Sequence, residues 1–401
     1  MTVSGIRLAR ASSPLRAHTE RLADDDVLLD HLGPGGAVWL DGAHGFVTAG
    51  VASVVAPEHA VSALRAIAQS GPAAPDGVGP RACGALPFTG GGRLVVPACI
   101  VERDTSGRVW RTTIGTDTDA APSRARARAA PATTRAGRAV TGYRVDAIGG
   151  YETWASGVAA ILALVDAGVA EKVVLAREVG VDAEEPFDIA TIARLLHATQ
   201  PGCIVYADGG FVGASPELLV RRVGRVVTSR PMAGTGLHAD ALVRSRKDAH
   251  EHALVVDAVV HTLATLCDDV LATGPAPVAL ADLTHLATTI TARAGDLDPT
   301  AVDLALALHP TPAVAGTPTE IARAEIARLE PTARDLYAGP CGWVDARGDG
   351  AFVVALRGAQ TDGTHARLHA GAGIVAGSRA EDEWAETQAK LEPMLRALVR
   401  R

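Results

Sequence analysis

The sequence predicts an α+β fold in which large antiparallel sheets are flanked by helices. Short apolar runs follow one another with tight turns between them, and Asp208-Gly209-Gly210 is a hairpin signal between two such runs. Helical periodicity stands apart from these runs, at residues 158–165 and 245–266. Strands in meanders, with the helices segregated from them, are typical of α+β folds rather than of βαβ units.

Each element rests on a local pattern. The apolar spacing of Val158, Ile161, Leu162 and Val165 predicts a helix that ends near Gly168. A final helix is expected to begin at Ser378, because Glu381 three residues later completes a capping-box pattern. The expected strands of this part of the chain are 172–177, 203–207, 211–213, 218–222, 226–228, 351–356 and 367–370.

The chain of 401 residues divides at one unusual stretch. Residues 119–141 are rich in Pro, Ala and Arg and have no apolar period, which favours an exposed loop over a basic binding arm. This loop separates residues 1–118, expected to contribute strands to the sheets, from the denser region 142–401. We expect the whole chain to form one integrated domain.

Composition excludes several classes of function. The net charge is −7 and only 3% of the residues are aromatic, which argues against a nucleic-acid or anionic-membrane binder. The five cysteines include no CxxC pair, as expected of reduced thiols. No apolar run approaches the roughly 20 residues that a membrane helix needs, and residues 1–10 lack a signal core. We therefore expect a cytoplasmic protein.

Carboxylates on two predicted helices are candidate ligands for a metal ion. Glu251 precedes an apolar helical stretch, and Glu383 and Glu386 lie one turn apart on the last helix, with Lys390 one turn further. From spacing alone, solvated helix faces are the favoured interpretation. The alternative is that two carboxylates from different helices hold Mg²⁺, which takes one or two carboxylates together with water and an anionic substrate.

Three further side chains are candidates for acid–base chemistry or anion binding. Lys172 begins an apolar strand, so it is either an edge lysine or a desolvated amine able to act as a base. Glu217 follows a Gly- and Pro-containing turn that fixes where its carboxyl group points. Arg357 ends an apolar strand, where a protein acid or a bound carboxylate is the expected partner.

The order of motifs identifies a family. From about Tyr151 to the C-terminus the chain resembles the chorismate-utilising enzymes, most closely the isochorismate synthases. The blocks that carry this resemblance are EKVVLAR (171–177), GASPELLV (213–220), RPMAGT (230–235), EHALVVDAV (251–259), HLATTITA (285–292), LHPTPAVAGTP (308–318), YAGPCGWVDARGDGAFVVALRGA (337–359) and HAGAGIVAGSRAEDEWAETQAKLEPML (369–395). Upstream, GALPF (84–88) is also similar to the family.

The resemblance implies a fold with a central cleft and Mg²⁺-dependent conversion of chorismate into isochorismate, in which water adds at C2 and the C4 hydroxyl leaves. By position, Lys172 matches the general base and Glu217 the general acid. Glu251 and Glu386 match the two Mg²⁺ ligands. The residues that match substrate contacts are Gly234, Thr235, Arg357, Gly371, Gly373 and Lys390, and Glu383 and His285 match supporting positions around them.

Two alternatives stay open at this point. A salicylate synthase would carry isochorismate on by losing pyruvate, and Gly236 after Thr235 is a weak sign against it. A non-catalytic chorismate-binding subunit would have lost an acid, a base or a metal ligand, and none is lost. The resemblance also implies a monomer whose product serves menaquinone or catechol-siderophore synthesis.

Overall fold

The backbone is dominated by antiparallel strand pairing, as the sequence predicts. The computed structural model describes residues 14–116, 142–236, 239–280 and 283–399. Within these ranges, 21 strands are hydrogen-bonded into one continuous sheet. Every pairing in these ranges is antiparallel except that between residues 16–18 and 68–70. The α+β prediction with large antiparallel sheets is confirmed.

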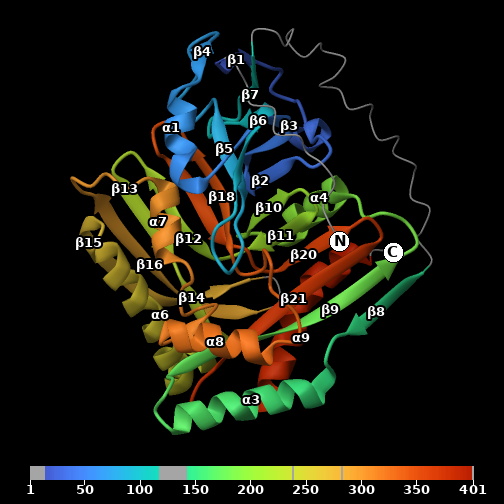
Figure 1. Cartoon of the computed structure of the whole chain (residues 1–401), viewed down its shortest axis with the longest axis vertical. Helices are drawn as coiled ribbons and strands as arrows, with labels where there is room; N and C mark the ends of the chain where they lie inside the picture. Colours follow the sequence, from blue (N-terminus) through green and yellow to red (C-terminus); the bar gives the residue numbers. More distant parts are fainter. Residues whose placement is uncertain (1–13, 117–141, 237–238, 281–282, 400–401) are drawn as a thin grey trace.

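The sheet divides into two branches (Figure 1). The first branch contains β1 (Arg16–Arg21), β2 (Ala37–Asp41), β3 (His44–Val55), β4 (Ala68–Ser70), β6 (Leu94–Arg103), β7 (Val109–Gly115), β8 (Tyr143–Ala147), β9 (Lys172–Ala183), β10 (Ile204–Asp208), β11 (Phe211–Ser215), β17 (Gly316–Thr317), β20 (Gly358–Asp362) and β21 (His365–Ile374). Its order is β4-β1-β7-β6-β3-β2-β10-β11-β20-β21-β9, and both β8 and β17 also pair with β9.

The second branch begins at Cys83, which pairs with Val95 of β6 in the first branch. It contains β5 (Arg81–Ala85), β12 (Leu218–Val223), β13 (Val226–Arg230), β14 (Met232–Gly236), β15 (Cys267–Ala279), β16 (Thr284–Ala294), β18 (Pro340–Asp345) and β19 (Gly350–Val354). Its order from β6 is β5-β18-β19-β12-β13-β16, and β14 and β15 both pair with β16. Strands that are distant in sequence thus lie side by side.

Helices cover the outer faces of both branches (Figure 1). They are α1 (Ala60–Arg65), α3 (Gly150–Asp166), α4 (Ile189–Thr199), α5 (Ala239–Arg244), α6 (Arg246–Ala264), α7 (Ala301–Leu308), α8 (Thr319–Leu329) and α9 (Ala380–Leu398), with short 3₁₀ turns η1 (Leu28–His31) and η2 (Pro57–His59). In the first branch α4 packs on β10 and β11, and α9 packs on β21. In the second branch α6 packs on β14, β15 and β16, while α7 packs on β12, β18 and β19.

The strands separate two hydrophobic cores. On β10, Ile204 and Tyr206 face one core, whereas Val205 and Ala207 face the other, which α4 and α9 cover. This alternation follows from the two-residue period of a strand. The same period puts Lys172 and Val174 on one face of β9, and Gly371 and Gly373 on one face of β21. Because β9 and β21 pair with Val174 opposite Gly373, these four residues share a surface.

Three local expectations differ from the structure. The helix expected at 158–165 begins earlier, at Gly150. The strand expected at 351–356 is β19 and ends at Val354, so Arg357 lies beyond it. The capping box expected at Ser378 is wrong: α9 begins at Ala380, and the Ser378 hydroxyl instead accepts a hydrogen bond from the Val375 N–H. The hydroxyl therefore closes the turn after β21.

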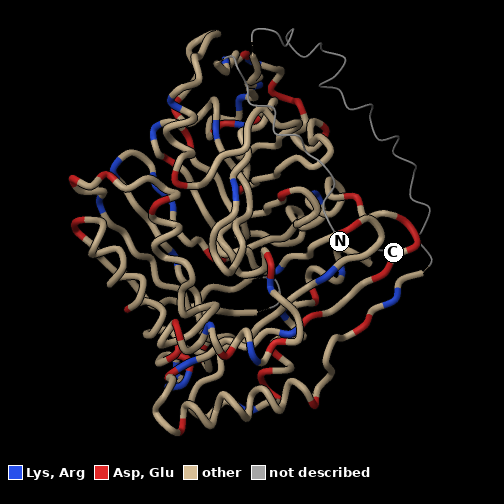
Figure 2. Tube along the Cα trace, viewed as in Figure 1, with Lys and Arg blue, Asp and Glu red and all other residues tan. Residues whose placement is uncertain are grey.

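The two parts of the chain share the sheet, since β2 pairs with β10 and β5 pairs with β18. The division into 1–118, 119–141 and 142–401 stays a prediction, because the whole of the expected loop 119–141 lies outside the described residues. Lys and Arg are interspersed with Asp and Glu along the described chain (Figure 2). Among the helices that the structure describes, none has the length and apolar character needed to cross a membrane.

Candidate active site

A cleft between the two branches collects the residues that the sequence singled out. The space in and above it is about 720 Å³, a figure that includes open solvent. Its walls come from β9 and β21, from β14 and β16, from α6 and α9, and from the loop before β17. Nine of the ten predicted site residues line the cleft: Glu217, Gly234, Thr235, Glu251, Arg357, Gly371, Gly373, Glu386 and Lys390.

Lys172 does not line the cleft directly. Its side chain is fully buried at the start of β9, and its Nζ lies 2.8 Å from Glu251 Oε1. Nζ makes no hydrogen bond of good geometry with the described residues, although it is buried. Burial would raise the pKa of Glu251, but the positive charges of Lys172, Lys390 and Lys247 hold that pKa below its ordinary value. Lys172 is therefore not an edge lysine; it neutralises a carboxylate that lines the cleft.

Gly373 makes the space for this ion pair. A Cβ atom at residue 373 would lie 2.2 Å from Glu251 Oε1 and 2.7 Å from Lys172 Cε. Both distances are far below van der Waals contact, so any other residue here would push the pair apart. The sequence predicted Gly373 as a substrate contact. The structure adds another reason for a glycine here, because a side chain would collide with the Lys172–Glu251 pair behind it.

Glu217 is a buried carboxyl group on the opposite wall. The turn after β11 is fixed by Ser215, whose hydroxyl donates to the Val354 carbonyl and accepts from the Glu217 N–H. Burial raises the pKa of Glu217 to about 7, against the opposing charges of Lys172 and Lys390 and a hydrogen bond from the Met232 N–H. A carboxyl group with this pKa carries a proton for a substantial fraction of the time at neutral pH. The general acid that the resemblance implies at Glu217 needs a pKa of this kind.

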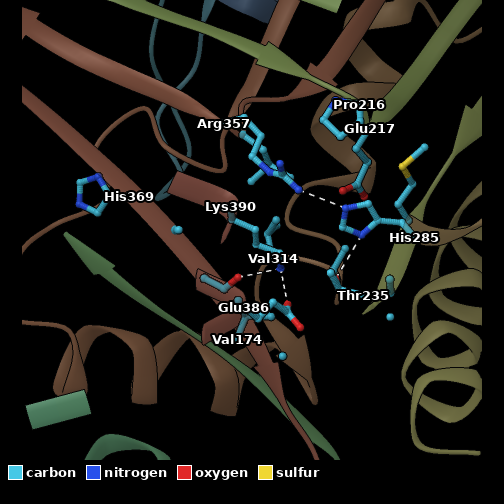
Figure 3. A pocket seen from close by; sticks show the side chains of 18 of the residues that line it. Val174, Pro216, Glu217, Thr235, His285, Val314, Arg357, His369, Glu386 and Lys390 are labelled. Atoms are coloured by element: carbon cyan, nitrogen blue, oxygen red, sulfur yellow. Dashed lines mark hydrogen bonds and ion pairs between the residues drawn. The ribbon is translucent and has the colours of Figure 1, made fainter. Parts of the chain in front are cut away.

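Arg357 is held at the cleft by a chain of side chains (Figure 3). It lies between β19 and β20 with φ of 52°, in the left-handed region that few non-glycine residues adopt. Its guanidinium donates to His285 Nε2 over 3.1 Å, and His285 Nδ1 lies 3.2 Å from Thr235 Oγ1. The Arg357 guanidinium can only donate, so Nε2 accepts and Nδ1 carries the ring proton.

His285 is thereby kept neutral. Burial lowers its pKa well below the ordinary value, and the charges of Arg357 and Lys390 lower it further. A neutral ring accepts the hydrogen bond from Arg357 without repelling its guanidinium, and Arg357 lines the cleft. His285 therefore positions Arg357, which agrees with the supporting position that the resemblance implies.

Lys390 supplies a second positive charge at the cleft. Its Nζ donates to Glu386 Oε1 over 2.5 Å and to the Gly371 carbonyl over 2.9 Å. The pairing with Glu386 is the one-turn spacing on α9 that the sequence showed. The carbonyl bond fastens α9 to β21. A Cβ atom at residue 371 would lie 3.1 Å from Val174 Cγ1 and 3.2 Å from the Leu175 carbonyl oxygen, so the position favours glycine.

Glu251 and Glu386 fit a hard divalent cation in part. Both carboxylates line the same cleft, from α6 and α9, and oxygen ligands are what Mg²⁺ takes. In the ranges that the structure describes, no group of three or more His, Cys, Asp or Glu side chains could hold a metal ion. The protein can therefore offer two carboxylates, and a bound anion and water would have to complete the coordination, as Mg²⁺ usually requires.

Several residues of the cleft were not predicted from the sequence. Tyr337 and His369 line it, with their rings stacked at 5.2 Å between centroids. Arg334 also lines it and is buried in an ion pair with Glu330 at 2.5 Å. Tyr337 and His369 are the first residues of two motifs that carry the family resemblance, and His369 stands in the same motif as Gly371 and Gly373, which could have indicated it. Nothing local marks Arg334.

The geometry agrees with the comparisons with known proteins. The family described as chorismate binding enzyme matches residues 90–399. The chain belongs to the chorismate-binding enzyme family. Among the curated members, isochorismate synthase DhbC of Bacillus subtilis is 38% identical over 278 residues, 64% of this chain and 70% of the relative. The putative isochorismate synthase MenF of Mycobacterium tuberculosis is 44% identical over 257 residues, 58% and 68% of the two chains.

Solved structures of chorismate-binding enzymes share the fold. The putative 2,3-dihydroxybenzoate-specific isochorismate synthase DhbC from Bacillus anthracis superposes with a TM-score of 0.77 at 29% identity, over 92% of this chain and 98% of that one. The menaquinone-specific isochorismate synthase MenF from Escherichia coli has a TM-score of 0.80 at 24% identity, over 97% and 95%. The second likeness is evidence for the fold alone.

We expect Gly373→Ala to destabilise this chorismate-binding enzyme by about 1–3 kcal/mol, the usual cost of forcing extra volume into a packed site. The new methyl group would collide with Glu251 and Lys172. Thermal unfolding measures the effect. Gly180→Ala is the matched control, because a Cβ there meets its nearest neighbour, His365 Cε1, at an ordinary 3.5 Å.

A double-mutant cycle separates this collision from a general effect of the substitution. In a Glu251→Ala background the carboxylate is gone, so adding Gly373→Ala should cost markedly less. Equal losses in both backgrounds would show that Gly373 has no bearing on the ion pair.

Proposed function

We propose that this chain is an Mg²⁺-dependent isochorismate synthase, which converts chorismate into isochorismate. The observation that carries the proposal is Glu217, a buried carboxyl group with a pKa of about 7 in a cleft that also presents Arg357 and Lys390. Such a cleft can bind a dianion and give its ring hydroxyl a proton. The relatives named isochorismate synthase support the same reaction.

The two carboxylates of chorismate have separate partners in this account. Arg357 would grip the enolpyruvyl carboxylate, since a guanidinium binds a carboxylate through two parallel hydrogen bonds. Lys390, Gly234 and Thr235 would face the ring carboxylate from β14 and α9. Gly234 has φ of 75°, which favours glycine, and so turns its backbone toward the cleft.

Acid and base act on opposite sides of the ring. Lys172 is the ammonium partner of Glu251 until it loses a proton. The resulting amine takes a proton from a water molecule whose oxygen bonds to C2. The two ring double bonds each shift by one position, and the bond between C4 and its hydroxyl oxygen breaks. Glu217 gives that oxygen a proton, so it leaves as water. One water enters and one leaves, and the proton gained by Lys172 balances the proton lost by Glu217.

Glu251 and Glu386 would hold the Mg²⁺ ion. Bound there, the ion would supply positive charge that binds the ring carboxylate and offsets the acidity of a protein with net charge −7. The chain's own part is to keep the two carboxylates ionised: Lys172 pairs with Glu251 and Lys390 pairs with Glu386.

We expect Glu386→Ala to raise the Mg²⁺ concentration for half-maximal rate by about tenfold or more, the scale on which metal sites respond to loss of a ligand or its support. The rate is measured as isochorismate formed at saturating chorismate during Mg²⁺ titration. Glu392→Ala is the control, since Glu392 is on the same helix and pairs with Arg396 away from the cleft. An unchanged titration would put the metal elsewhere.

Product analysis tests the proposal against its alternatives. The purified protein is incubated with chorismate, with and without Mg²⁺, and the products are separated by chromatography. Isochorismate that forms only with Mg²⁺ is the expected result. Salicylate with pyruvate would identify a salicylate synthase, and unchanged chorismate would identify a non-catalytic chorismate-binding subunit.

A further inference from the structure

Lys247 lies one helical turn before Glu251 on α6, and no role has been assigned to it so far. Its Nζ donates to Glu383 Oε1 across to α9, at 2.5 Å. The two partners differ in environment, because the Lys247 side chain is 34% exposed and that of Glu383 is 3% exposed. The lysine thus reaches from the solvent side toward a buried carboxylate.

This contact completes a set of three ion pairs at the junction of β9, α6 and α9. Lys172 pairs with Glu251, Lys390 with Glu386, and Lys247 with Glu383. We call these six residues the carboxylate–ammonium cluster. Three carboxylates and three ammonium groups balance in charge, so the cluster can stay ionised without a metal ion.

Lys247 interacts with all three carboxylates of the cluster. Burial alone would lower the pKa of Lys247, but the negative charges of Glu383, Glu251 and Glu386 outweigh it and raise that pKa. In return, Lys247 is one of the charges that lower the pKa of Glu251. Burial and the charge of Glu386 raise the pKa of Glu383, against the effect of Lys247. The positive charge of Lys247 therefore acts where a divalent cation would act.

We propose that Lys247 is a built-in counter-ion of the carboxylate–ammonium cluster and that its charge weakens the binding of a divalent cation to Glu251 and Glu386. The proposal rests on the proposed function only for these two metal ligands. Two like charges near the same carboxylates repel each other, and part of the carboxylate charge is already neutralised by the lysine. Lys247 is then a residue that sets metal affinity and takes no part in the chemical step.

A purely structural role for Lys247 would have a different signature. As a link between α6 and α9, the Lys247–Glu383 pair would affect stability, and its loss would leave Mg²⁺ binding unchanged or weaker. The counter-ion role predicts tighter binding on removal of the charge. The direction of the change in Mg²⁺ affinity therefore separates the two roles.

The test is the binding of Mg²⁺ alone to Lys247→Met, a neutral variant of similar length. We expect the variant to bind Mg²⁺ about tenfold more tightly than the unsubstituted protein, as isothermal titration calorimetry measures. Lys247→Arg keeps the charge and should keep the original affinity. Arg246→Met removes a neighbouring exposed charge with the same change in net charge, and it should have a much smaller effect.

A second readout uses thermal unfolding in the same Mg²⁺ series. A ligand that binds the folded protein raises its melting temperature, so the midpoint of this rise should move to lower Mg²⁺ in Lys247→Met. Adding Glu386→Gln to Lys247→Met should remove the gain if the ion binds at the proposed ligands. This series uses no chorismate, so its outcome is separate from the product analysis that tests the proposed function.

Several results would overturn the proposal. If Lys247→Met binds Mg²⁺ no more tightly than the unsubstituted protein, the lysine does not compete with the ion. The same holds if Lys247→Met shows no detectable binding. Tighter binding that persists with Glu386→Gln would place the ion outside the cluster. An equal gain in Mg²⁺ affinity in Arg246→Met would show that the effect comes from the net charge of the protein and not from Lys247 itself.

Discussion

Lys172→Ala should lower the rate of isochorismate formation by about 10²- to 10⁴-fold, the usual contribution of a general base, while chorismate still binds. A base acts mainly in the transition state, so its loss lowers kcat more than it weakens substrate binding. Arg357 and Lys390, the proposed substrate-binding groups, are held by other partners, His285 and Glu386, and remain in place. The rate is measured by chromatography and binding by calorimetry.

Lys172→Arg is the control that separates chemistry from charge. Arginine keeps a positive charge beside Glu251 but is always protonated, so it cannot act as a base. We expect Lys172→Arg to be as inactive as Lys172→Ala. Because its guanidinium can pair with Glu251, we expect it to unfold at a higher temperature than Lys172→Ala. A rate near that of the unsubstituted protein in either variant would contradict the assignment of Lys172 as the base.

Glu217→Gln should also lower kcat by about 10²- to 10⁴-fold. Glutamine has nearly the same shape but carries no proton that it can give to the departing hydroxyl. The substitution leaves the turn after Ser215 intact, because that turn is made by the serine hydroxyl and backbone groups. Chorismate affinity is therefore expected to stay close to the original value, and an active Glu217→Gln would rule out this acid.

The pH dependence of the unsubstituted enzyme gives an independent check on Glu217. Burial raises the pKa of Glu217 to about 7, and in the proposed mechanism the protonated form is the active one. The rate kcat should therefore fall as pH rises through the neutral range, and this alkaline limb should be missing from the residual activity of Glu217→Gln. A kcat that stays constant up to pH values well above 7 would contradict the role.

The sequence predicted which residues belong to the site better than which of them face the cleft. The order of the motifs identified the family, and nine of ten named residues line one cleft. That Lys172 lies behind Gly373 could not be predicted, because it depends on the pairing of β9 with β21, which are distant in sequence. The register of that pairing decides which side chain faces the cleft and which lies behind it.

Local patterns failed where tertiary contacts decided the outcome. Ser378 has the spacing of a helix cap, but its hydroxyl bonds backward to the Val375 N–H. Arg357 continues an apolar run, yet it lies in a left-handed turn beyond β19. Nothing in the local sequence distinguishes Lys247, and only the fold brings its ammonium group on α6 to Glu383 on α9. In each of these three positions the conformation or contact depends on the fold and cannot be inferred from the neighbouring residues.

The central claim is that water from the solvent enters at C2 while the C4 hydroxyl leaves. The most direct measurement is to incubate the protein with chorismate and Mg²⁺ in H₂¹⁸O and to analyse the early product by mass spectrometry. The account predicts isochorismate that carries one ¹⁸O, at the C2 hydroxyl. Isochorismate without ¹⁸O would contradict the addition of water, and the absence of isochorismate would contradict the proposed function itself.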